Sequence, residues 1–203
     1  MFKTARSKVQ TLVTAGAGTI AALFVAGLMG AFGALPAHGP PQLPPGAVIE
    51  AGRWRLQLVR AYVSHARVHG VPLKPGQKAL VLEVDMTNRT AQSDKGYFNV
   101  FTPDGIILPD PSPMIVLTRD STLTPELHPG MTERMAYVWP LAGDATVPAS
   151  LAFGVTAEIF KPRDNLHGTP GWYNPYRLGT LTLPVADLPA TGQSAIGQPE
   201  SGS

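Results

Sequence analysis

The sequence predicts an all-β protein, an antiparallel β-sandwich preceded by one N-terminal transmembrane helix. Three observations support this fold. Residues 78–90 alternate apolar and polar side chains, turn-forming residues recur along the chain, and residues 11–35 carry no charge. Glycine and proline number 21 each among 203 residues, which favours short strands joined by turns over long helices.

Residues 78–90, with the sequence KALVLEVDMTNRT, have the clearest strand pattern. Successive side chains of a strand point to opposite faces, so a period of two predicts one face on a core and the other partly exposed to water. The two predicted faces consist of Leu80, Leu82, Val84 and Met86, and of Val81, Glu83, Asp85 and Thr87. We expect this strand at the centre of the sandwich.

The N-terminal region has the features of a membrane anchor. Residues 1–10 form a short basic tail, and the uncharged run 11–35 is long enough to cross a bilayer as a helix. Basic residues before such a run predict a cytoplasmic N-terminus and an extracytoplasmic C-terminal domain. A cleaved signal peptide is the alternative. The run exceeds the roughly 7–15 apolar residues of a signal peptide, which favours an uncleaved signal anchor.

Composition sets the remaining boundaries. Residues 36–46 are rich in proline and predict an extended, semi-rigid linker. Residues 47–188 contain the expected strands and form the β-sandwich ectodomain. Residues 189–203 are small and polar, which predicts a disordered tail.

Alternating or β-rich segments bounded by turn signals predict the other strands of the ectodomain. They lie at residues 47–50, 53–64, 97–102, 106–108, 114–118, 131–139, 150–160 and 178–185. The Pro-Asp-Gly sequence at 103–105 predicts a hairpin between the third and fourth of these segments.

Charge and cysteine content exclude several classes of function. Three of the 16 basic residues precede the membrane segment, which leaves 13 basic against 14 acidic side chains after it. A near-neutral domain lacks the basic patch of a nucleic-acid-binding protein, so no nucleic-acid partner is expected. Arg53, Arg55 and Arg60 are interpreted as part of a solvated strand face. The absence of cysteine excludes disulfides and a thiolate nucleophile.

The order of these segments resembles a known family. A Trp-bearing strand (GRWRLQLVRAYV) comes first, KALVLEVDMTNRT follows, and LHPGMTERMAYVWP comes later. This order is similar to that of an immunoglobulin-like extracytoplasmic domain family of unknown function, related to secreted mycobacterial immunoprotective antigens. The resemblance covers roughly residues 47–160. It implies an immunoglobulin-like antiparallel β-sandwich outside the cell, and it assigns no role to any residue. The Ala-, Gly- and Pro-rich composition also resembles that of actinobacterial proteins.

No metal site, cofactor or catalytic centre is expected. His65 and His69 lie four residues apart in SHARVHG, and on a strand that spacing separates them by about 13 Å. His128 lies near two methionines, a combination that suits copper, but packing of the methionines in or beside the core explains them as well. These three histidines are the candidates for metal binding. Motifs of hydrolases, nucleotide-binding loops and zinc proteases are absent from the sequence, so no enzymatic activity is expected.

Residues 161–177, with the sequence KPRDNLHGTPGWYNPYR, are the segment most suggestive of function. They are expected to form a long loop between two strands, and long loops in compact domains are often functional. Amphipathic aromatic rings and arginines are typical of interface hot spots. The predicted partner-binding residues are Trp172, Tyr173, Tyr176, Arg163 and Arg177. Alternatively, the rings fold back and cover one end of the sandwich.

Together these features predict a single-pass protein of the cell membrane whose extracytoplasmic domain is a binding or scaffolding module. Its partner is expected to be another protein of the cell envelope. The alternative is a carrier of a small ligand or metal in the envelope, using His65, His69 or His128.

Overall fold

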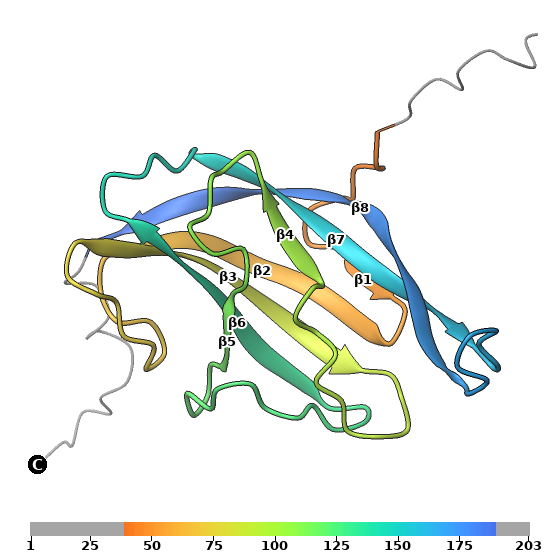
Figure 1. Ribbon diagram of the computed structural model, residues 1–203. Coiled ribbons are helices and arrows are strands. Elements are labelled where there is room, and N and C mark those ends of the chain that lie inside the picture. Colours follow the sequence, from red (N-terminus) through yellow and green to blue (C-terminus); the bar gives the residue numbers. More distant parts are fainter. Residues whose placement is uncertain (1–38, 190–203) are drawn as a thin grey trace, which may run out of the picture. The chain divides into compact units, whose positions relative to one another are not determined.

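The computed structural model describes residues 39–189, and this part of the chain consists of strands and loops (Figure 1). Its eight strands are β1 (Val48–Ala51), β2 (Trp54–Ser64), β3 (Gln77–Asn88), β4 (Phe101–Asp104), β5 (Met114–Leu117), β6 (Thr132–Ala142), β7 (Ser150–Lys161) and β8 (Gly171–Leu188). Within residues 39–189 there is no helix of the length and hydrophobicity needed to cross a bilayer. The transmembrane helix predicted at 11–35, and residues 190–203 of the predicted tail, lie outside the described residues.

The strands form one curled sheet whose two halves pack face to face as a sandwich (Figure 1). The strand order is β4-β7-β8-β2-β3-β6-β5, with β1 added beside β2. Strand β8 belongs to both halves. Its earlier residues pair antiparallel with β7, and its last four pair in parallel with β2, from Ala61 opposite Val185 to Ser64 opposite Leu188. The prediction of an all-β domain is confirmed. The prediction that every strand pair is antiparallel is wrong, because β2 and β8 pair in parallel.

Strand β3 has the alternation predicted from its sequence. Leu80, Leu82, Val84 and Met86 are fully buried in the main core between the two halves. On the opposite face, Val81 belongs to a second hydrophobic cluster that includes Val68 and Val71 from the loop after β2. This loop buries the part of β3 that the sequence predicted to be partly exposed to water.

The prediction of a hairpin around residues 103–105 is wrong. Gly105 does have the positive φ of a turn, at 75°, but residues 106–108 form no strand and Ile107 is 91% exposed. Strand β4 pairs instead with β7, with Phe101 opposite Val155. The turn sequence specifies a local bend, whereas burial of Phe101 in the main core favours pairing with a strand far along the chain.

Residues 41–43 lie against the edge of β8. The amide of Leu43 donates a hydrogen bond to the Thr180 carbonyl at 2.8 Å, and the Thr180 amide donates to the Pro41 carbonyl at 2.9 Å. Gly179 leaves room for the Leu43 side chain, because a Cβ on Gly179 would lie 2.7 Å from Leu43 Cγ. The folded domain therefore includes residues 41–43, which belong to the proline-rich stretch.

Candidate functional site

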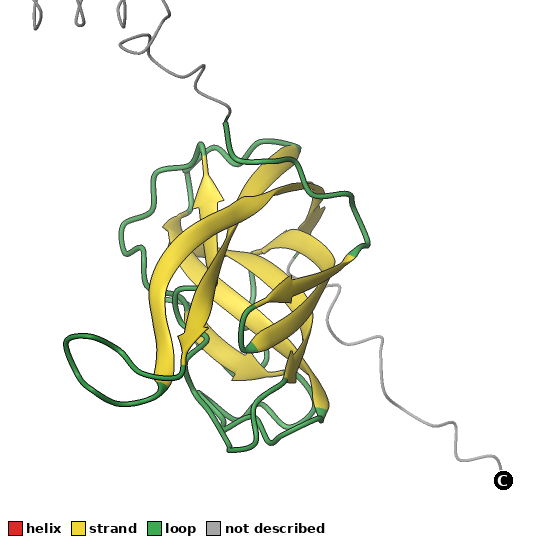
Figure 2. Cartoon of the chain, turned by 90° about the vertical axis from the view of Figure 1, so that its right-hand side faces the viewer, coloured by secondary structure: helices red, strands yellow, loops and turns green. Residues whose placement is uncertain are grey.

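Beyond Phe101, the first residue of β4, strands β7 and β8 continue as a two-stranded arm, which we define as residues 157–176 (Figure 2). In the arm, Ile159 pairs with Tyr173 and Phe160 pairs with Trp172. The prediction of a long loop at 161–177 is therefore wrong in part. Strand β7 runs to Lys161 and β8 begins at Gly171, so the loop comprises only residues 162–170. A register shift after Ala157 and a positive φ of 54° at Asn174 accommodate Pro175 as a bulge, so this proline does not end the strand.

The arm exposes a group of apolar side chains. The exposed fractions are 50% for Ile159, 51% for Phe160, 85% for Leu166 and 44% for Tyr176. Ile159 and Phe160 are consecutive residues of β7, so their side chains lie on opposite faces of the arm. The arm therefore exposes apolar side chains on both faces and at its tip.

The tip of the arm is held in shape by the carboxylate of Asp164. One oxygen accepts hydrogen bonds from the amides of Leu166 at 2.9 Å and His167 at 3.1 Å, and the other accepts from Lys161 Nζ at 3.0 Å. Lys161 and the two backbone amides lower the pKa of Asp164 to about 2. The backbone amide of Gly168 also donates to the Asp164 carbonyl at 2.8 Å. These bonds fix the loop that displays Leu166.

The aromatic rings of the arm pack mainly on the arm itself. The rings of Trp172 and Phe160 meet edge to face at 5.4 Å, and those of Tyr173 and His167 stack at 5.8 Å. Trp172 also lies near the turn between β1 and β2, where a Cβ on Gly52 would be 3.2 Å from its ring. Both Trp172 and Tyr173 are therefore half-buried, and the more exposed ring of the predicted set belongs to Tyr176.

The two predicted arginines have different environments. Arg163 is exposed at the tip. Arg177 lies at the base of the arm, where its guanidinium forms an ion pair with Asp104 and donates to Thr180 Oγ1 at 3.1 Å and to the Gly179 carbonyl at 3.2 Å. These contacts hold the Arg177 side chain against the sheet, although the residue is still exposed to solvent.

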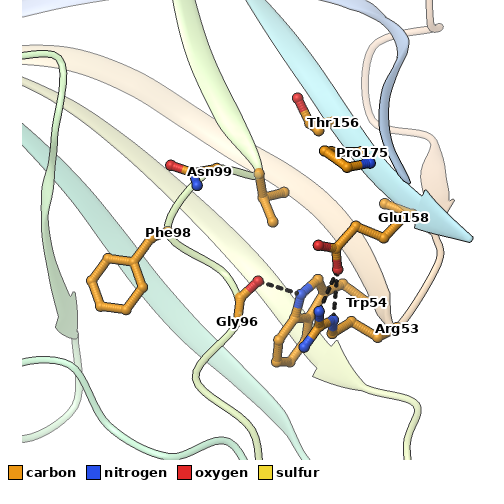
Figure 3. A pocket seen from close by; sticks show the side chains of 10 residues that line it. Arg53, Trp54, Gly96, Phe98, Asn99, Thr156, Glu158 and Pro175 are labelled. Carbon is orange, nitrogen blue, oxygen red and sulfur yellow. Dashed lines mark hydrogen bonds and ion pairs between the residues drawn. The ribbon is translucent and has the colours of Figure 1, made fainter. Parts of the chain in front are cut away.

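A pocket of about 240 Å³ lies beside the base of the arm (Figure 3). One wall comes from the loop before β4, through Gly96, Phe98 and Asn99, and the opposite wall comes from the arm and its base. The residues that line the pocket are Ala51, Arg53, Trp54, Gly96, Phe98, Asn99, Val100, Thr156, Glu158 and Pro175. Three segments distant in sequence thus converge on one small cavity.

Arg53 connects the two walls of this pocket. Its Nε donates to Glu158 Oε2 at 2.9 Å, and its Nη1 donates to Asp94 Oδ2 at 2.7 Å. Gly96 permits this arrangement, because a Cβ there would lie 2.4 Å from Arg53 Nη1. Burial acts to lower the pKa of Arg53, but its bonds to Asp94 and Glu158 outweigh burial, and the pKa is raised. Arg53 therefore keeps its positive charge in the triad that it forms with Asp94 and Glu158.

Sequence reasoning did not identify this pocket. It assigned Arg53 to a solvated strand face, whereas the Arg53 side chain is only 16% exposed and is bound to two carboxylates. Asp94 and Glu158 are 41 and 105 residues away along the chain. No local sequence pattern links them, so only the paired strands reveal the triad.

The three candidate metal ligands lie in separate environments. His65 Nε2 lies 3.0 Å from Asp187, His69 Nε2 lies 3.3 Å from Glu83, and His128 Nδ1 lies 2.8 Å from the hydroxyl of Ser93. Within residues 39–189 no three histidine, aspartate or glutamate side chains are grouped closely enough to hold a metal ion. The structure thus brings none of these histidines together.

Glu83 is the centre of a second polar cluster, on the outer face of β3. Its carboxylate accepts two hydrogen bonds from Arg60, both at 2.9 Å, and one from the hydroxyl of Tyr62 at 3.0 Å. Burial acts to raise the pKa of Glu83, but the bonds from His69, Arg60 and Tyr62 outweigh burial and lower the pKa to about 2. All the polar atoms of this buried group have partners, which indicates a structural role.

No protein-family model and no curated protein matches this sequence. Among solved structures, the chain is similar to an uncharacterised β-sandwich protein from Clostridium difficile 630. The TM-score is 0.47 at 8% sequence identity, and the match covers 74% of this chain and 97% of the other. The function proposed below therefore depends on the residues of this chain.

Proposed function

We propose that this protein is a binding or scaffolding module of the cell envelope, held at the cell membrane by residues 11–35 with its sandwich domain outside. Its partner is another envelope protein, and the arm is the contact. The single observation that carries the proposal is the preorganised display of apolar side chains on the arm, above all Leu166, which is 85% exposed on a loop fixed by Asp164.

Preorganisation matters for binding because ordering a loop costs free energy at the moment of association. In the arm much of this cost is met before any partner arrives, since the Asp164 hydrogen bonds and the ring contacts of Trp172 and Tyr173 exist within the domain. Amphipathic rings, an exposed leucine and Arg163 supply the side chains that interfaces favour. In this proposal the protein binds its partner without catalysing a reaction.

An immunoglobulin-like relationship is part of the proposal. In immunoglobulin constant domains, four strands in the order A-B-E-D face three strands in the order C-F-G. If β2 to β8 are taken as A to G, the strand order β4-β7-β8-β2-β3-β6-β5 has the same two groups. This correspondence supports an immunoglobulin-like topology. Membership of the extracytoplasmic family that includes the secreted mycobacterial antigens, and an actinobacterial source, are proposed on the resemblance of the sequence alone.

Site-specific photo-crosslinking in intact membranes tests the proposed contact. A photoreactive phenylalanine analogue replaces Leu166 in the full-length protein, and a matched control replaces Ile107, which is 91% exposed but lies on a different loop. We expect one envelope protein to be captured from position 166 and not from position 107, and its capture to fall when Ile159→Thr and Phe160→Ser are added. An identical capture pattern from both positions would remove the arm as the contact.

A further inference from the structure

The pocket beside the arm differs from the arm surface because it is recessed and contains charged side chains. Trp54 lies at its floor and is 2% exposed, while the ring of Phe98 stands at its rim and is 41% exposed (Figure 3). A volume of about 240 Å³ is below the roughly 300–1,000 Å³ typical of sites for drug-sized ligands. The pocket therefore suits one side chain of a partner rather than a whole small molecule.

The charges at the pocket do not balance. Arg53 supplies one positive charge, and Asp94 and Glu158 supply two negative charges within hydrogen-bonding distance of it. An anionic ligand would meet this excess negative charge, whereas a cationic one would reduce it. Charge complementarity therefore favours a cation as the occupant.

Glu158 offers the direct binding group for such a cation. Both hydrogen bonds from Arg53 end on Glu158 Oε2. No described residue donates a hydrogen bond to Oε1, and Figure 3 shows this second oxygen on the side of the carboxylate facing the loop of Gly96 and Asn99. The Glu158 side chain is 29% exposed, so a partner group can reach it.

The apolar parts of the pocket suit the stem of a long cationic side chain. Lysine and arginine bury their methylene groups against apolar surface while the charged head reaches a polar partner. Trp54 and Val100 line the apolar part of the pocket, and the ring of Phe98 adds apolar surface at its rim. An alkyl stem and a charged head are thus matched by two different parts of one cavity.

We propose that this pocket binds a lysine or arginine side chain of the partner protein, with the cationic head on Glu158 Oε1 and the stem against Trp54 and Phe98. The inference rests on the proposed function, since it names the chemistry of the partner that the arm contacts. The arm would supply apolar contact area, and the pocket would select a basic residue beside it.

Small cations that mimic the side chains test the pocket without the partner. Amide resonances of Gly96, Phe98, Asn99 and Glu158 are followed by NMR in the full-length protein in detergent micelles, during titration with n-butylguanidinium and n-butylammonium. Neutral 1-pentanol and anionic pentanoate have similar stems and serve as matched probes. We expect saturable shifts with the two cations, weaker binding of pentanol, no binding of pentanoate, and weaker cation binding at higher salt.

Two pocket variants and one control complete the test. Glu158→Gln keeps the shape of the side chain and removes its charge, and we expect it to weaken cation binding about tenfold, as for the loss of one charge-assisted hydrogen bond. Phe98→Ala leaves the Arg53 triad intact and should weaken binding several-fold. Asp187→Asn removes a charge from an exposed residue paired with His65 and should leave binding unchanged.

The proposal is overturned if neither cation shifts the pocket amides, if pentanol binds as tightly as the cations, or if both pocket variants bind like the wild type. These outcomes are distinct from failure of the proposed function. A protein captured from position 166 together with an inert pocket would remove only the lysine or arginine assignment. Cation binding without any captured protein would instead remove the arm as the contact.

Discussion

Gly52 lies directly against the backbone of Glu158, so that a Cβ at Gly52 would stand 2.4 Å from the Glu158 carbonyl oxygen. This contact joins the turn between β1 and β2 to the first part of the arm. It also sets the distance between Arg53, the next residue after Gly52, and the Glu158 carboxylate. The position of the pocket and the distance between its charged groups thus depend on the absence of a side chain at Gly52.

Gly52→Ala should destabilise the domain and disturb the arm. The substitution adds a methyl group against the Glu158 carbonyl and forces alanine into a positive φ of 70°. We expect a loss of about 2–4 kcal/mol in the free energy of unfolding, measured by urea denaturation, as the sum of the conformational and steric costs. Gly76→Ala is the matched control, because Gly76 has a φ of 76° and open space around it. Equal losses for both variants would contradict the contact.

Gly154→Ala should be costly only while Arg177 is present. A Cβ at Gly154 would overlap three atoms of the Arg177 guanidinium, so the guanidinium must move and release Asp104 and Thr180. A double-mutant cycle with Arg177→Ala measures this coupling by urea denaturation. We expect a coupling energy of about 1 kcal/mol or more. Additive effects of the two substitutions would show that the residues do not interact in solution.

Acid should weaken the domain through Glu83. Its pKa is lowered from 4.5 to about 2 in the folded state, so its contribution to stability is complete above about pH 4.5 and is lost as the pH falls towards 2. Glu83→Gln should cost about 2 kcal/mol at neutral pH, from the loss of charge-assisted hydrogen bonds, and should flatten the pH dependence of stability below pH 4.5. The readout is the urea midpoint measured at several pH values. Glu126→Gln, at an exposed glutamate, is the control.

Asp164→Ala should loosen the tip of the arm without unfolding the sandwich. The substitution removes the acceptor for the amides of Leu166 and His167 and the ion pair with Lys161. We expect faster hydrogen exchange at these two amides, while amides of β3 keep their protection. Leu166→Ala, by contrast, should change the unfolding free energy by less than about 0.5 kcal/mol, because the side chain is exposed. Unchanged exchange in Asp164→Ala would show that the backbone alone holds the tip.

The sequence predicted those parts of the fold that depend on local alternation. The two faces of β3 and the course of β2 follow from the period of two along one strand. Strand pairing was predicted less well. The turn at residues 103–105 suggested a local hairpin, but Phe101 is opposite Val155, more than fifty residues later. Such pairing depends on the burial of side chains from both strands, which a single turn cannot specify.

The candidate site was predicted in part for a similar reason. The projecting arm does carry Trp172, Tyr173, Tyr176 and Arg163. These residues could be predicted because the sequence shows a cluster of aromatic residues among glycine and proline. Pro170 and Pro175 suggested a loop, and the bulge at Asn174 that allows a strand there has no clear sequence signal. The exposed apolar residues Ile159 and Phe160 were assigned to an ordinary strand, since their exposure depends on β4 beginning at Phe101, opposite Val155.

Strand β8 has a consequence for how the protein is made. Its last four residues are the parallel neighbours of β2, so a chain interrupted before Val185 lacks the pairing that joins the two halves of the sandwich. Synthesis proceeds from the N-terminus, and contacts between residues so distant in sequence form slowly. The domain therefore completes its fold only after Val185–Leu188 have been made, and until then Ala61–Ser64 of β2 lack their partner on one side.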